Sequence, residues 1–289
     1  MTTDEARPSA QRLRTLLVTY LGSVVHRTGD WMPIGGAVEL LGEAGLDPAS
    51  VRTAVSRLKK RGWLDSETRQ GVRGYALTGT AIAELAAGDR IIWHSRPPAD
   101  LAEGWCVVNF SVPESRRDKR HQLRQDLTAL GFGNIGAAVW IAPARMRDEA
   151  ARTIAQQGLT DQCAMFVGDY AGGKDLKVLV GDAWDLEEID GRYRQFLDSY
   201  ADRAEHLPDE PPSGRAAFVR YLHVVDHWRK LPYRDPGLPV EVLPGHWSGA
   251  AAKTLFERLV ATLEDPALAH AADVYRALGV GFPLSPKHR

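Results

Sequence analysis

The sequence is poor in cysteine and has no long apolar run. Its 289 residues include only Cys106 and Cys163, too few for a disulfide framework or a four-cysteine zinc site. Reduced thiols are usual in the cytosol, so a cytoplasmic protein is the simplest interpretation. The apolar run Leu16–Val25 is interrupted by polar and small residues, and it is too short for a membrane span or a signal peptide. We therefore expect no membrane partner.

Charge is balanced over the chain but concentrated in one short stretch. The sequence has 36 Lys and Arg against 37 Asp and Glu, a formal net charge of −1. This balance argues against a protein that coats nucleic acid non-specifically, although it permits a local basic face. Such a face is indicated in Ser50–Arg61, which has no acid and five basic residues, namely Arg52, Arg57, Lys59, Lys60 and Arg61.

The first segment has the pattern of three helices. Apolar spacing predicts helices over Ala10–Val25 and Ile34–Ala44, with a short extended piece at Trp31–Ile34 between them. Asp47 and Pro48 open a third helix, because proline is tolerated in a first turn and Asp47 can cap the free N–H groups there.

The third helix is predicted to be amphipathic. At about 100° per residue, its apolar sector is formed by Val51, Ala54, Val55 and Leu58. The opposite side carries Thr53, Ser56 and Lys60, flanked by Arg52 and Arg57. We expect a buried stripe and an outer face of short polar residues bordered by long cations.

A hairpin follows this helix. Residues 62–68 and 75–78 are separated by a glycine-rich basic loop, and Thr78 then starts another helix. Two helices, a basic helix and a basic-tipped hairpin are the order of a winged helix-turn-helix, whose third helix enters the DNA major groove while the hairpin touches the backbone or minor groove. The predicted contacts to an operator in double-stranded DNA are Ser50, Arg52, Thr53, Ser56, Arg57, Lys60, Arg69, Gln70 and Arg73.

Two other interpretations of this segment stay open. A basic helix is often only a solvated surface, and winged folds also serve as protein-interaction modules.

The middle segment alternates strands and helices, with strands at Trp105–Val112, 137–143 and Cys163–Gly168, as in a small α/β sandwich. Val178–Val180 is predicted to add a strand to that sheet.

Three stretches together resemble the PaaX family of bacterial transcriptional repressors. They are "SVRTAVSRLKKRGWL" followed by "GYALTGTA", "VPESRRDKRHQLRQDLTALGFGNIGAAVWIAP" and "HWRKLPYRDPGLPVEVLPGHWSG". The resemblance covers most of the chain and implies an α+β, multidomain protein. Residues 1–98 would be a winged helix-turn-helix domain, 99–175 a ferredoxin-like central domain similar to CRISPR adaptation nucleases, and 176–289 a mostly helical domain for effector binding and dimerisation.

The resemblance also implies a homodimer that represses catabolic genes and is released by an aryl-CoA thioester, phenylacetyl-CoA in the namesake. An enzymatic alternative is a metal-dependent nuclease built on the central domain. Related nucleases place an acid at the end of the first strand, where this chain has Asn109, Phe110 and Ser111, with Glu114 farther on. We therefore expect a scaffold without catalysis, and no cofactor.

The candidate effector residues lie outside the first segment. Arg116, Arg120 and Arg124 recur every four residues and could form a ridge that binds CoA phosphates, extends the DNA contact or is simply solvated. Trp184, Tyr193 and Trp228 have planar rings that suit an aromatic acyl group. The stretch His227-Trp228-Arg229 matches the family's His-aromatic-Arg stretch and is a candidate for the effector pocket or dimer contact. His223 and His227 share a helix face but have no obvious third ligand, so we predict no metal site.

Overall fold

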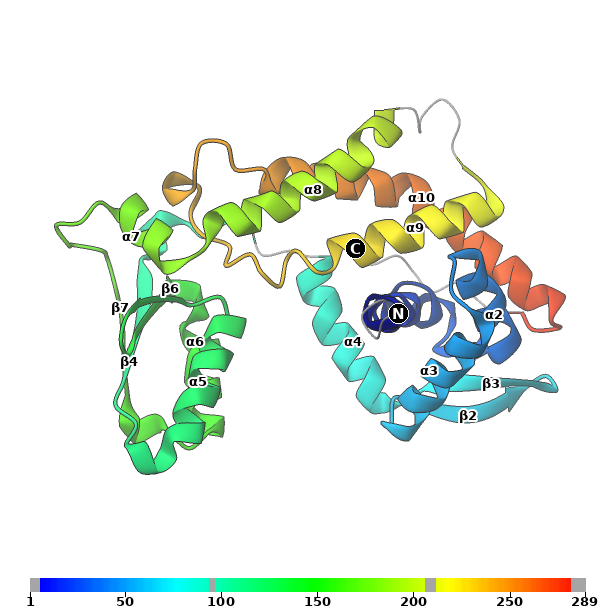
Figure 1. Ribbon diagram of the computed structural model, residues 1–289, viewed down its shortest axis with the longest axis horizontal. Coiled ribbons are helices and arrows are strands. Elements are labelled where there is room, and N and C mark those ends of the chain that lie inside the picture. Colours follow the sequence, from blue (N-terminus) through cyan, green and yellow to red (C-terminus); the bar gives the residue numbers. More distant parts are fainter. Residues whose placement is uncertain (1–5, 94–96, 206–211, 282–289) are drawn as a thin grey trace. The chain divides into compact units, whose positions relative to one another are not determined.

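The computed structural model describes residues 6–93, 97–205 and 212–281. It combines helices with two small antiparallel sheets, as expected for the α+β class (Figure 1). The helices are α1 (Ala6–Tyr20), α2 (Ile34–Glu43), α3 (Pro48–Lys60), α4 (Gly79–Ile92), α5 (Arg117–Ala129), α6 (Arg147–Gln156), α7 (Leu176–Ala183), α8 (Leu186–Glu205), α9 (Gly214–Trp228) and α10 (Gly249–Ala277). The strands are β1 (Trp31–Pro33), β2 (Leu64–Arg69), β3 (Val72–Leu77), β4 (Trp105–Phe110), β5 (Gly133–Gly136), β6 (Val139–Pro143) and β7 (Cys163–Gly168).

The chain forms two compact units, each built from separate stretches of sequence. The terminal unit comprises Met1–His94, Phe196–Arg229 and Ala251–Arg289. The central unit comprises Ser95–Gln195 and Lys230–Ala250. The last helices of the chain therefore fold with its first segment, while the proline-rich stretch after α9 folds with the middle segment. The division into 1–98, 99–175 and 176–289 stays a prediction.

In the terminal unit, α2 and α3 lie beside a three-stranded sheet of order β1-β3-β2 (Figure 1). The strands β2 and β3 pair antiparallel from Leu64↔Leu77 to Arg69↔Val72, which confirms the predicted hairpin. The first helix lies at its predicted position, although it starts at Ala6 and is followed by a π-helical turn over Leu21–Val25.

Helices from both ends of the chain build the core of the terminal unit. Buried Tyr20 of α1 hydrogen-bonds through its hydroxyl to Tyr275 of α10 and meets Phe218 of α9 edge to face. Trp228 stacks on Phe256 with ring centroids 4.5 Å apart and planes inclined by 10°. Such aromatic pairs contribute about 0.5–1.5 kcal/mol beyond their buried area, so they tie α9 and α10 firmly to one core.

A buried ion pair adds a polar contact to this core. The Nη1 of Arg27 donates to Oε1 of Glu264 at 2.8 Å, and Tyr221 donates its hydroxyl to the same oxygen at 3.3 Å. The side chains of Arg27 and Glu264 are only 4% and 9% exposed. Because each charge depends on the other for compensation, the pair fixes α10 against the turn that leads into β1.

The central unit holds a four-stranded antiparallel sheet of order β5-β6-β4-β7. Its strands and helices follow in the order β4-α5-β5-β6-α6-β7. Buried Leu123 and Leu127 of α5 and Ala150 and Ile154 of α6 pack with inward strand residues such as Val108. A second cluster, which includes Trp105, Ile141, Val180 and Leu186, covers the opposite side of the sheet.

One prediction for the central unit is wrong, and one strand was not predicted. Val178–Val180 is helical rather than extended, because the Asp175 carboxylate accepts hydrogen bonds from the backbone N–H groups of Lys177 and Val178 and so caps α7. The glycine-rich stretch around Gly133, for which no strand was predicted, pairs with β6 as the edge strand β5. Side-chain periodicity could not show this strand, because two of its four residues are glycines, which have no side chain and are depleted in strands.

Candidate nucleic-acid interface

The buried stripe of α3 sets which of its residues reach solvent. Asp47 accepts a hydrogen bond from the Ser50 N–H at 2.8 Å, and Pro48 occupies the first turn. This contact lowers the pKa of Asp47 from its ordinary value, so the cap stays charged at neutral pH. Val51, Val55 and Leu58 are buried, as predicted from their spacing.

The predicted outer face of α3 is exposed. Its exposed residues are Arg52, Thr53, Ser56, Arg57, Lys59 and Lys60, while Ser50 at the helix start is half-buried. Within the part of the chain that the structure describes, Arg57, Lys60 and Arg61 have no carboxylate partner. The face therefore presents uncompensated positive charge beside the short hydroxyl side chains of Thr53 and Ser56.

A contact that sequence reasoning missed joins α3 to the hairpin. Lys59 donates from Nζ to the Ser66 hydroxyl at 2.7 Å. The Nζ of Lys59 is thus directed to β2. No pattern in the sequence indicates this contact, because every residue of β2 after Leu64 is polar and the strand shows no apolar–polar alternation.

The hairpin tip has the geometry of a tight two-residue turn. Gln70 and Gly71 both have positive φ, 51° and 79°, as the central residues of a type I′ turn require. Gln70 and Arg73 are exposed, and Arg73 has no carboxylate partner among the described residues. Arg69 differs from them, since it is half-buried and pairs with Glu67 at 2.8 Å. The three predicted hairpin residues are therefore not equivalent.

The three ridge arginines lie in the central unit but do not share one helix. Arg116 ends a 3-10 turn before α5, and its Nη1 donates to Gln162 Oε1 at 3.3 Å. Arg120 pairs with Glu114 at 2.8 Å, and Arg124 lies 5.7 Å over the Trp140 ring. Each guanidinium thus has a contact within the unit, which reduces its freedom to bind a ligand phosphate.

Two predicted effector aromatics also belong to the central unit. Trp184 donates from Nε1 to the Gly131 carbonyl at 3.0 Å and lines a pocket of about 590 Å³. Tyr193 is buried and donates to Asp235 at 2.7 Å. The pocket is lined by one basic residue, Lys177, and by three acids, Asp182, Asp185 and Glu187. These charges do not favour the phosphates of CoA.

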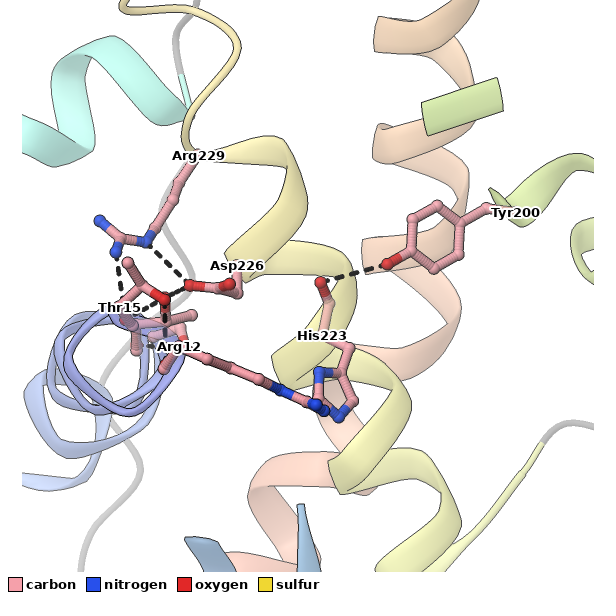
Figure 2. Close-up of polar contacts among 8 residues, drawn as sticks. Arg12, Thr15, Tyr200, His223, Asp226 and Arg229 are labelled. Carbon is pink, nitrogen blue, oxygen red and sulfur yellow. Dashed lines mark hydrogen bonds and ion pairs between the residues drawn. The ribbon is translucent and has the colours of Figure 1, made fainter. Parts of the chain in front are cut away.

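His227, Trp228 and Arg229 lie in the terminal unit. Trp228 is buried in the stack with Phe256 and donates from Nε1 to the Ile92 carbonyl at 3.0 Å. Arg229 donates to the Thr15 carbonyl at 3.1 Å and to Asp226 at 3.4 Å, which Figure 2 shows at the end of α9 facing α1. The ring of His227 packs on Phe196. These three residues belong to the terminal unit, whereas Trp184 and Tyr193 belong to the central unit.

His223 is held by contacts within the terminal unit. Its backbone carbonyl accepts a hydrogen bond from Tyr200 at 3.2 Å (Figure 2). The described ranges contain no group of three or more His, Cys, Asp or Glu side chains placed to hold a metal ion. Among the helices that the structure describes, none combines the length and apolar character needed to cross a bilayer.

Three family models match the chain in succession. The PaaX-like protein model matches residues 12–81, the PaaX protein central Cas2-like domain 98–180, and the PaaX-like protein C-terminal domain 184–273. The transcriptional repressor PaaX of Escherichia coli strain K12 is 26% identical over 262 residues, which is 88% of this chain and 81% of that protein.

The fold also resembles a solved structure. It matches the uncharacterised protein Rv0674 from Mycobacterium tuberculosis with a TM-score of 0.57, over 90% of this chain and 97% of the other, at 18% identity. This likeness concerns the fold alone.

Proposed function

Because this chain belongs to the PaaX family of transcriptional regulators, we propose that it is a repressor that binds an operator in double-stranded DNA. The observation that carries the proposal is the exposed face of α3, where Arg57 and Lys60 have no carboxylate partner in the described chain. Lysine and arginine that neutralise phosphates supply the largest sequence-independent part of DNA affinity. The family consists of regulators rather than enzymes, so no catalytic site is assigned.

The first segment would act as a winged helix-turn-helix. The exposed face of α3 would lie in the major groove, and the β2–β3 hairpin would lie along the backbone or minor groove. The order β1-β3-β2 of the sheet and the packing of α2 on α3 support this assignment. Arg52 and Arg57 would contact base edges or phosphates, while Ser50, Thr53 and Ser56 would lie close to bases and Lys60, Gln70 and Arg73 to the backbone.

The central unit would be a ferredoxin-like scaffold that joins two protomers. The β-α-β-β-α-β order and the sheet order β5-β6-β4-β7 support the fold assignment. Strand β7 lies at an edge of the sheet and exposes 65% of Phe166 and 48% of Val167. Because open edges and apolar patches are common protein contacts, we place the homodimer contact there rather than in residues 176–289, where the family resemblance implied dimerisation. Phe166→Glu should then sediment as a monomer while the native chain sediments as a dimer.

Family membership supports an aryl-CoA thioester such as phenylacetyl-CoA as the effector that releases the DNA. A tenfold release requires about 1.4 kcal/mol of coupling between the two sites. Calorimetric titration with aryl-CoA thioesters and the free acids, each followed by an operator-binding assay, tests this part. If neither class binds, or binding leaves operator affinity unchanged, the effector proposal fails while repression can still stand.

The decisive experiment for the regulator itself is selection of duplexes from a random library, followed by binding and cleavage assays on the enriched duplex. We expect salt-dependent binding to a pseudo-palindrome, and repression of a reporter that carries this sequence. The competing proposal of a nuclease predicts Mg²⁺-dependent cleavage that Glu114→Gln abolishes. Glu114 instead pairs with Arg120 at 2.8 Å on an exposed surface, which favours a structural role.

A further inference from the structure

Arg69, the last residue of β2 before the turn at the hairpin tip, is held by three different groups. Its Nε donates to Glu67 Oε1 at 2.8 Å, and its Nη2 donates to Glu67 Oε2 at 3.2 Å. Its Nη1 donates to the Gly29 carbonyl at 3.3 Å, and its Cζ lies 5.4 Å from the centroid of the Trp31 ring. This bidentate, stacked arrangement suits a guanidinium and cannot be reproduced by a lysine ammonium.

The Trp31 ring also lies against the strand β3. Trp31 is fully buried, and its Nε1 donates to the Glu67 carbonyl at 3.4 Å. A Cβ atom at Gly74 would come within 2.3 Å of the ring, so only glycine permits this approach. Gly74 is the register partner of Glu67. The ring therefore lies against the β3 backbone next to the carboxylate that Arg69 binds.

We propose that Arg69 is a positioning residue, which sets the direction of the β2–β3 hairpin through Glu67, Gly29 and Trp31 and does not itself bind a DNA phosphate. The inference rests on the proposed DNA-binding function. Arg69 joins the hairpin to the turn that precedes β1, so it holds Gln70 and Arg73 in the direction in which they meet the duplex.

Electrostatics supports this assignment over a direct contact. A phosphate at Arg69 would have to compete with Glu67, and it would lie close to a carboxylate that repels it. The side-chain hydrogen bond from Arg69 lowers the pKa of Glu67, so this carboxylate stays charged at neutral pH. Arg73 has no such competitor among the described residues, which makes it the matched arginine for comparison.

Two conservative substitutions separate the alternatives by the direction of their effect. Arg69→Lys retains the positive charge but loses the bidentate pairing, so a positioning role predicts that it binds the selected duplex as weakly as Arg69→Ala. Glu67→Gln removes a negative charge near the DNA. A direct contact at Arg69 therefore predicts tighter binding by Glu67→Gln, whereas positioning predicts weaker binding because the pairing that directs the hairpin is lost.

The measurement is Kd for the selected duplex at several salt concentrations, well below the unfolding temperature of each full-length variant. We expect Arg69→Lys, Arg69→Ala and Glu67→Gln each to lose about tenfold in affinity, or about 1.4 kcal/mol, and to flatten the slope of log K against log salt to the same extent, because each variant misdirects Arg73. The double variant Glu67→Gln/Arg69→Ala should lose no more than either single variant, because both changes break the same contact. As the control, Arg73→Ala should flatten the slope and Arg73→Lys should restore it.

Three results would overturn the proposal: native affinity in Arg69→Lys with a flattened slope in Arg69→Ala, tighter binding by Glu67→Gln, or native affinity in Arg69→Ala. Failure of the DNA-binding proposal gives a different result, in which no duplex is enriched and Arg57→Gln and Arg73→Ala have no effect. The positioning contact then remains measurable in the absence of DNA, as a lower unfolding temperature of Arg69→Lys and Glu67→Gln but not of Arg73→Lys.

Discussion

Replacing Arg57 by glutamine tests the α3 interface most directly. Arg57 is exposed on the last turns of α3, and within the described chain no carboxylate compensates its charge. Removing an exposed side chain of this kind changes the free energy of unfolding by no more than about 0.5 kcal/mol. A loss of DNA affinity would therefore report a lost contact rather than a damaged fold.

The size of the loss depends on what Arg57 contacts. Each phosphate contact makes the slope of log K against log salt more negative by about 0.9. Removing one such contact from each of two protomers therefore makes the slope less negative by about 1.8. When salt is raised from 50 to 200 mM, the ratio of native to variant affinity therefore falls by about tenfold. A bidentate contact to guanine instead costs about 1–3 kcal/mol per base, relaxes the preference at one position and leaves the slope nearly unchanged.

Fluorescence anisotropy with the selected duplex and single-base variants of it, at four or more salt concentrations, separates the two outcomes. Arg152→Gln provides the matched control, because Arg152 is exposed on α6 in the central unit and its loss changes net charge equally. If Arg57→Gln keeps the native affinity, slope and base preference, or if Arg152→Gln changes them as much, α3 is not the recognition helix.

Three further changes test the rest of the structure. Glu264→Leu should lower the free energy of unfolding, measured by chemical denaturation, by about 3–5 kcal/mol, because it leaves the buried Arg27 charge without its partner. Adding Arg27→Met should recover most of this loss. If the double variant instead loses the sum of the two single losses, the coupling is refuted. Burial raises the pKa of Cys106 to about 11, so this thiol should react with a thiol reagent near pH 8 only after unfolding; rapid labelling of the folded protein would contradict its burial. Burial, with Asp235 as a further cause, raises the pKa of Tyr193 above its ordinary 10.0. The neutral Tyr193 therefore contributes fully to the stability of the folded state below its ordinary pKa of 10.0. This contribution declines at higher pH, where Tyr193 ionises in the unfolded chain but stays neutral in the folded one. Melting curves between about pH 8 and pH 11 should show a smaller alkaline decline in Tyr193→Phe, and an identical decline would refute this effect.

Local patterns in the sequence determined the elements of the proposed DNA-binding segment. The spacing of Val51, Val55 and Leu58 places α3, because a helix with a single apolar stripe can bury only that side. Asp47 and Pro48 mark its start, and the basic, glycine-containing loop marks the hairpin. These features depend on neighbours within a few residues, so they can be recognised without knowledge of the fold.

Only the tertiary structure decided which charged and aromatic side chains are free to act. Arg69 and Arg73 look alike in the sequence, yet Arg69 binds Glu67 and the ring of Trp31, a residue 38 positions away. Trp228 looked available for a ligand, but its ring stacks on Phe256. Contacts between distant residues depend on how the elements pack, and a local pattern carries no information about them. For the same physical reason, hydrophobic spacing located the basic helix of this protein, while packing alone distinguished the exposed Arg73 from Arg69, which pairs with Glu67.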